Sequence, residues 1–170
     1  KLTVEYDGTP YVGWQRQKNG RGVQTTIEEA IAAFCQQSVT LQVAGRTDTG
    51  VHGLAQVCHA DLSKPWADKT VRDAINAYLM QAGEPVAIIS AEQVDEAFHA
   101  RFSAKARRYV YRIINQPTPI ALERNRAENF ARLILIGDAI RPYRGTDAFG
   151  YSYQPENDSR TAMVMRSETS

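Results

Sequence analysis

The sequence has few of the residues and runs that mark several protein classes. Its 170 residues include two cysteines, Cys35 and Cys58. They show no CxxC spacing, which argues against a disulfide framework and a zinc site. The longest apolar run is Ala30–Cys35, far shorter than the roughly 18 residues of a transmembrane helix. No basic and apolar leader opens the chain, so we expect no secretory signal, no membrane partner and a cytoplasmic location.

Net charge is also nearly absent. Lys and Arg number 20 and Asp and Glu number 19, which gives a formal charge of +1. The charges are nevertheless segregated along the chain. Residues 8–27 and 97–116 contain basic residues and no acid, whereas acids outnumber bases between them. Short basic clusters are common on solvated surfaces, but a polyanion meets only one face of a protein. The near-neutral total therefore does not exclude a nucleic-acid partner.

Hydrophobic periodicity predicts the order of the elements. A capping box at Thr25–Glu28 predicts the start of one helix, and another follows Pro65. Strands are expected near residues 2–6, 39–43, 54–61, 86–89 and 107–115. The order β-α-β-β-α-β with one further strand is typical of an α+β, ferredoxin-like (split βαβ) sandwich, in which both helices cover one face of an antiparallel sheet. Its open face is suited to RNA.

The regular strand and helix patterns of the sequence are interrupted at Pro117. We therefore expect a ferredoxin-like half-domain over residues 1–116 and an atypical tail over residues 117–170. Residues 128–140 show no clean helical period, and the chain beyond Arg141 predicts loop because turn-forming residues recur throughout it. Tyr151 and Tyr153 are its only strand-like feature.

The most unusual segment is the nonapeptide Gly45–Gly53. Its three glycines flank Arg46, Asp48 and His52 on a predicted turn that leaves a strand. Loops at strand ends often carry chemistry, and an ionised aspartate can act as nucleophile or base. A structural turn with an Asx-type hydrogen bond explains the same spacing. Capping or packing accounts for His52 and His99, so we predict no role for them.

Asp48–Gly50 is also the tripeptide of aspartic proteases. Those enzymes share a proton between two carboxylates, so a single copy would require a homodimer with the dyad at its axis. The flanking residues argue against this interpretation, because Arg46 and Thr47 separate the tripeptide from the preceding apolar strand and Val51-His52 follows it.

The whole nonapeptide resembles the signature of the tRNA pseudouridine synthase A family. Further blocks resemble that family in the family's order, namely Glu5–Thr9 with Gly13–Gln17, Val23–Gln24, Phe98–Ala104 and Arg107–Tyr111. The resemblance extends from residue 1 to about residue 127. It implies an isomerase that converts uridine to pseudouridine in the anticodon stem-loop of tRNA. It also implies a cytoplasmic homodimer that needs no cofactor and no metal.

The resemblance also implies roles for three residues. Asp48 matches the family's nucleophilic aspartate, Tyr109 matches the tyrosine of the uracil pocket, and Arg46 matches the arginine that holds the flipped-out nucleotide. Breaking a C–N glycosidic bond develops positive charge on the sugar, which a carboxylate can stabilise or trap. An aromatic ring can hold the detached uracil by stacking, after the base has been extruded from the RNA. Whether Asp48 attacks the sugar, attacks the base or removes a proton stays open.

The two basic stretches supply the candidate RNA contacts, which are Arg16, Arg101, Arg107 and Arg108. Without the resemblance, Tyr109 is better explained as a core aromatic, and Trp14 fits a core anchor as well as a stacking residue. After Ala127 the sequence no longer resembles the family, whose members carry a second half. The alternative function is therefore a catalytically inactive RNA-binding fragment.

Overall fold

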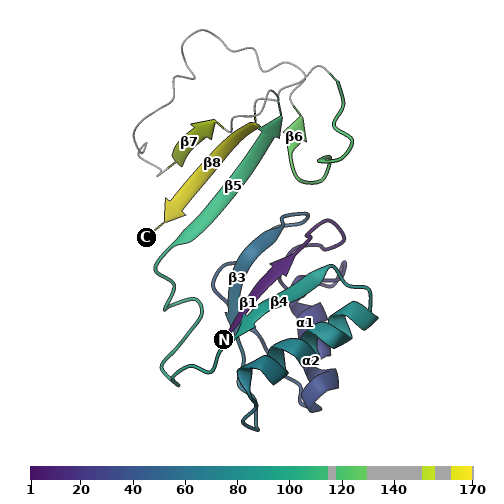
Figure 1. Ribbon diagram of the computed structural model, residues 1–170, viewed down its shortest axis with the longest axis vertical. Helices are drawn as coiled ribbons and strands as arrows, with labels where there is room; N and C mark the ends of the chain where they lie inside the picture. The colour runs from purple at the N-terminus through teal and green to yellow at the C-terminus, as the bar shows by residue number, and fades with distance from the viewer. Residues whose placement is uncertain (115–117, 130–150, 156–161, 170) are drawn as a thin grey trace. The chain divides into compact units, whose positions relative to one another are not determined.

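The computed structural model describes residues 1–114, 118–129, 151–155 and 162–169 (Figure 1). The chain divides into two compact units, Lys1–Ala104 and Lys105–Ser170. Each unit is described by itself below. The units divide at residue 104, whereas the sequence places a domain boundary at residue 116. Among the described residues, the strand that lies between these two positions pairs with strands of the second unit.

The first unit contains the predicted order of helices and strands. Its elements are β1 (Leu2–Tyr6), α1 (Val23–Cys35), β2 (Gln42–Val43), β3 (Gly53–His59), α2 (Asp68–Gln81) and β4 (Val86–Ala91). The four strands form one sheet in the order β2-β3-β1-β4. Every neighbouring pair is antiparallel. The expected α+β class, with an antiparallel sheet and two helices, is confirmed.

Alternation of buried and more exposed residues along β1 and at the start of β4 puts the core on one face of this sheet. Leu2, Val4 and Tyr6 of β1 are buried, while Glu5 is exposed. Apolar positions spaced by three or four residues in α1 and α2 meet these side chains. Figure 1 shows both helices on the same side of β1, β3 and β4. The opposite face carries exposed side chains, among them Ala87 of β4.

Helix α1 begins earlier than the sequence predicts. It starts at Val23, and Gly22 at its N-cap makes no side-chain cap, so the predicted capping box at Thr25–Glu28 is wrong. The reason lies in the preceding loop. The first amides of the helix donate to backbone carbonyls there, Val23 N to Gly13 O at 3.2 Å and Gln24 N to Trp14 O at 2.9 Å. These bonds satisfy donors that a capping side chain otherwise binds.

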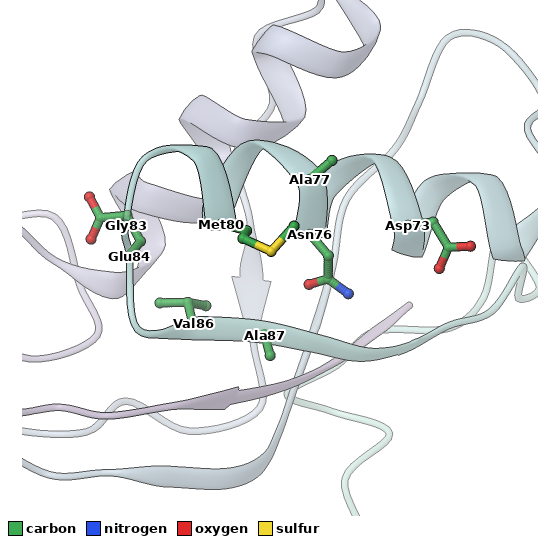
Figure 2. A pocket seen from close by; sticks show the side chains of 8 residues that line it. All are labelled: Asp73, Asn76, Ala77, Met80, Gly83, Glu84, Val86 and Ala87. Atoms are coloured by element: carbon green, nitrogen blue, oxygen red, sulfur yellow. The ribbon is translucent and has the colours of Figure 1, made fainter.

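The outer edge of β4 is closed by helix α2. Asn76 donates from Nδ2 to Ile88 O at 2.9 Å, and Ile88 N donates to Asn76 Oδ1 at 2.7 Å. Figure 2 shows the Asn76 side chain reaching from the helix toward the strand, beside an open groove that Met80, Val86 and Ala87 help to line. An edge strand with free backbone groups is a site for unwanted pairing, and Asn76 occupies these groups at the middle of β4.

The second unit contains a four-stranded sheet in its described residues. Its strands are β5 (Arg107–Ile114), β6 (Glu128–Asn129), β7 (Tyr151–Pro155) and β8 (Ala162–Thr169), in the order β6-β5-β8-β7. Strand β8 is antiparallel to β5 over its whole length and also pairs with β7.

The prediction of loop beyond Arg141 is wrong for β7 and β8. Strand β8 pairs with β5, which is distant in sequence, and β7 pairs with β8; local turn signals reveal neither pairing. Residues 130–140 of the aperiodic segment lie outside the described residues.

Candidate functional site

The candidate site is the loop that joins β2 to β3, which are neighbouring strands of the first sheet. Arg46 and Asp48 are exposed on this loop, and Thr47 between them is half-buried. The exposed turn that the sequence predicts is confirmed. Two of the candidate site residues, Arg46 and Asp48, thus flank a half-buried threonine.

The loop after β1 holds the Asp48 loop by its backbone. Trp14 N donates to Thr47 O at 2.9 Å, and Gly50 N donates to Tyr11 O at 3.4 Å. The Tyr6 hydroxyl and Thr47 Oγ1 are 2.8 Å apart and share a hydrogen bond. Thr47 is therefore fixed through both its carbonyl and its side chain. Because Thr47 precedes Asp48, these bonds restrict the backbone from which the Asp48 side chain projects.

Two glycines allow this close packing. Gly13 has φ +110°, and a Cβ on it would lie 2.7 Å from Thr47 O and 3.2 Å from the carbonyl carbon of Asp48. At Gly8 a Cβ would collide with the Val51 carbonyl. Only glycine combines the positive φ with the missing side chain that Gly13 requires. The motif Gly13–Gln17 lies outside the Asp48 loop, and its glycine lets the two segments pack closely together.

Trp14 lies in the core beneath the two loops. Its side chain is fully buried, and its ring centroid is 5.8 Å from that of Tyr6. The indole N–H has no hydrogen-bond partner within the described part of the chain. Trp14 is therefore a core anchor, and the interpretation that it stacks on RNA is wrong.

His52 connects the same two loops. Its Nδ1 lies 3.1 Å from Gly8 N and 3.2 Å from Asp7 Oδ1. One nitrogen cannot accept from Gly8 and donate to Asp7 at once, so the neutral ring accepts from Gly8 and the protonated ring pairs with Asp7. This contact agrees with the interpretation of His52 as a capping residue.

Arg16 is exposed, but it forms an ion pair with a buried acid. Its Nη2 is 2.6 Å from Glu28 Oε2, and the Glu28 side chain is 5% exposed. Glu28 Oε1 also accepts from Leu41 N at 2.9 Å and from Gln24 Nε2 at 2.8 Å. Burying a carboxylate is costly unless it is paired and hydrogen-bonded, and here every partner comes from a different turn or segment.

Sequence reasoning missed Glu28 as a functional support. The available signal was an acid directly beside Ile27, on the apolar face of α1. Glu28 links the loop that carries Arg16 to helix α1 and to the start of β2, and so it supports the entry to the Asp48 loop.

Arg21 is also engaged by acids. Its Nε is 2.9 Å from Glu84 Oε1, and its Nη2 is 2.6 Å from Glu29 Oε2. The Tyr11 hydroxyl donates to Glu84 Oε2 at 2.7 Å. Burial, followed by this hydrogen bond, raises the pKa of the Tyr11 phenol above its ordinary range. Part of the first basic stretch is therefore neutralised in space by acids from helix α1 and from the α2–β4 turn.

The remaining candidate residues lie elsewhere. Tyr109, Arg107 and Arg108 are on β5 of the second unit, where Tyr109 is 37% exposed. Tyr109 is not a fully buried core aromatic. Arg101 lies on a turn of the first unit, with its guanidinium over the ring of Phe102. The structure brings Arg46 and Asp48 together on one loop and Arg107 to Tyr109 together on one strand.

Three further features of the described residues concern disulfides, metal sites and membrane-spanning helices. Cys35 and Cys58 are both free, so the two do not form a disulfide. In that part of the chain, no three His, Cys, Asp or Glu side chains gather into a metal site. Likewise, none of the described helices combines the length and apolar character needed to cross a bilayer.

Comparison with known proteins places this site in a family. A family model described as tRNA pseudouridine synthase matches residues 2–103, which is more than half of the chain and includes the whole Asp48 loop. Curated relatives named tRNA pseudouridine synthase A, from Brucella ovis, Brucella canis and Brucella suis, are each 57% identical over 127 residues. These alignments cover 75% of this chain and 51% of each relative, so the chain spans about half the length of the curated relatives it matches. The chain belongs to the tRNA pseudouridine synthase family.

Proposed function

We propose that this chain isomerises uridine to pseudouridine in tRNA, with Asp48 as the catalytic residue. The observation that carries the proposal is an exposed carboxylate on a backbone clamped from both sides, within residues 2–103 that match the family. A carboxylate carried on a fixed backbone loses less freedom when it meets a bound nucleotide, which is how positioning lowers a barrier.

The chemistry fits the residue types on the loop. The C–N bond between ribose and uracil breaks, a C–C bond to C5 of the base forms, and the C5 proton leaves while N1 regains a proton. The Asp48 carboxylate stabilises or traps the electron-poor intermediate. Arg46 is exposed on the same loop, where a cation favours the RNA backbone and holds the extruded nucleotide. Tyr109 contributes the aromatic wall for the detached uracil.

The proposal includes the finer points of fold and partners. A split βαβ, ferredoxin-like arrangement is supported by the position of β3 between β1 and β2, each of which is antiparallel to it. The substrate site is the anticodon stem-loop, the location is the cytoplasm, and the active form is a homodimer that uses no cofactor. Arg16, Arg101, Arg107 and Arg108 contact the RNA backbone. The substrate site, the location, the homodimer and the lack of a cofactor rest on the family resemblance, and the four arginine contacts rest on the basic stretches that contain them.

The decisive experiment measures tritium release from tRNA labelled at C5 of uridine, using the full chain. We expect release by the unchanged protein and a loss on the order of 10³-fold in Asp48→Ala. Asp95→Asn is the matched control, because Asp95 is an exposed carboxylate outside the loop, and it should leave release unchanged. A tRNA whose anticodon stem-loop uridines are replaced by cytidine should release nothing.

Two results contradict the proposal. Release that persists in Asp48→Ala removes the assignment of the catalytic residue. Binding of tRNA by the unchanged chain without any release favours the alternative, a catalytically inactive RNA-binding fragment. Light scattering at several protein concentrations tests the homodimer separately.

A further inference from the structure

An exposed aromatic ring lies on the turn that ends the first unit, Phe98–Ser103. The Phe102 side chain is 79% exposed, although phenylalanine is ordinarily a core residue. Its ring is not loose. The His99 ring centroid is 4.4 Å away at an interplanar angle of 33°, and Arg101 Cζ lies 6.0 Å from the centroid of the Phe102 ring. The turn therefore presents a phenyl ring, an imidazole and a guanidinium as one small surface, and residues 97–104 contain no acid.

Two histidines hold the turn in shape. His99 Nδ1 accepts from Arg101 N at 3.2 Å and from Phe102 N at 3.4 Å. His59 Nδ1 accepts from Ala100 N at 3.2 Å. Both rings use an unprotonated nitrogen, and their centroids are 5.0 Å apart. Burial, and then the proximity of His99, lower the pKa of His59, which favours this neutral form. The backbone of the turn is thus ordered before any partner binds.

The turn lies at the opposite end of β3 from the Asp48 loop. Gly53, the first residue of β3, follows that loop, and His59, which binds the turn, is the last. The six steps between them span about 20 Å at the rise of a β-strand. The turn is therefore outside the reach of the nucleotide at Asp48, and a ligand that touches both must be a large one.

We propose that the turn Phe98–Ser103 is a second RNA contact, where Phe102 stacks on an unpaired base and Arg101 binds a phosphate. This inference rests on the proposed function, in which tRNA is the substrate. Stacking on an exposed aromatic ring beside a cation is the usual way that proteins hold single-stranded nucleic acid. A protein partner fits less well, because a stable protein interface buries roughly 800 Å² on each side and one phenyl ring with its neighbours supplies only a fraction of that.

The test compares tRNA affinities of full-chain variants by fluorescence anisotropy at several salt concentrations. Phe102→Ala should weaken binding about tenfold and leave the salt dependence unchanged, because stacking releases no counterions. Arg101→Ala should weaken binding and lower the slope of log K against log salt by about 1. Met80→Ala is the matched control, because Met80 is 78% exposed on α2, and it should bind like the unchanged chain.

A second pair of variants tests the ordered shape of the turn. His99→Asn keeps an oxygen acceptor near the position of Nδ1, whereas His99→Ala removes the acceptor. We expect His99→Asn to bind tRNA more tightly than His99→Ala by several-fold. Equal affinities of these two variants would overturn the role given to His99. Thermal melts of every variant show whether each protein is folded.

The outcomes separate this inference from the proposed function. In tritium release, Phe102→Ala should raise KM and leave kcat unchanged, because its contact lies far from Asp48. Unchanged affinity in both Phe102→Ala and Arg101→Ala overturns the RNA contact while the enzyme assignment stands. A change of oligomeric mass in Phe102→Ala, with unchanged tRNA affinity, assigns the turn to a second copy of the chain and overturns the proposal. Binding without tritium release by the unchanged chain overturns the enzyme and supports the contact if the two variants weaken binding.

Discussion

At the scale of single residues, the site depends on side chains that are absent as much as on those that are present. Gly8 and Gly13 lie outside the nonapeptide, yet they let the loop after β1 pack directly on the backbone around Asp48. Thr47 and Trp14 add hydrogen bonds that hold this backbone, and we call these packing contacts and hydrogen bonds together the clamp on Asp48. The carboxylate and the guanidinium of the site are exposed, whereas the residues that aim them are mostly buried.

Gly13→Ala tests the clamp. The new Cβ would meet Thr47 O and the backbone of Asp48, and the positive φ adds strain, so we expect a loss of about 2 kcal/mol or more in the free energy of unfolding. Tritium release should fall as well, since the Asp48 loop must shift. Urea unfolding measures the first effect.

Gly83→Ala is the control for Gly13→Ala. Gly83 has φ +68°, and a Cβ there would meet nothing within 4 Å. The Gly83→Ala substitution should lower the free energy of unfolding by about 1 kcal/mol, from backbone strain alone, and leave tritium release intact. Equal effects of the two substitutions on stability and activity would contradict the clamp.

At the scale of elements, the ends and edges of helices and strands are completed by other segments. Helix α1 is capped by carbonyls of the loop after β1, and the outer edge of β4 is closed by Asn76 of α2. Both devices use polar groups that secondary structure alone leaves unpaired. Local sequence patterns do not predict these hydrogen bonds, because the donor and the acceptor belong to different elements.

Asn76→Ala is the corresponding prediction. It removes two hydrogen bonds and leaves the Ile88 backbone open, so we expect stability to fall by about 1–2 kcal/mol and aggregation at high concentration to increase. Thermal unfolding and light scattering measure these effects. Gln81→Ala removes an exposed amide from the same helix and should change stability by less than about 0.5 kcal/mol. A loss in Gln81→Ala as large as that in Asn76→Ala would contradict the role of Asn76.

At the scale of the whole molecule, charge segregation in the sequence is only partly charge segregation in space. Arg16 and Arg21 belong to an acid-free stretch, but they pair with Glu28, Glu29 and Glu84. These pairs join the loop after β1 to helix α1 and to the α2–β4 turn. The first basic stretch therefore contributes to folding as well as to surface potential.

Salt dependence separates these two uses of arginine. Arg107→Ala with Arg108→Ala should lower tRNA affinity and reduce the slope of log K against log salt by about 2, roughly one for each phosphate contact. Arg21→Ala should leave that slope unchanged and lower the melting temperature instead, because it breaks two ion pairs. Identical slopes in the double variant and the unchanged chain would show that this strand does not face the RNA.

The sequence by itself determined the element order of the first unit, its α+β class and the loop that carries Asp48, because periodicity, turn residues and motifs are local properties of the chain. The tertiary structure decided the start of α1, the buried position of Trp14, the pairing of Arg16 with Glu28 and the strands of residues 151–155 and 162–169. Each of these depends on contacts between different segments of the chain, whose energies no local pattern contains. The clamp on Asp48 depends on both. Its glycines can be seen in the sequence, but only the packing shows which backbone atoms lie against them.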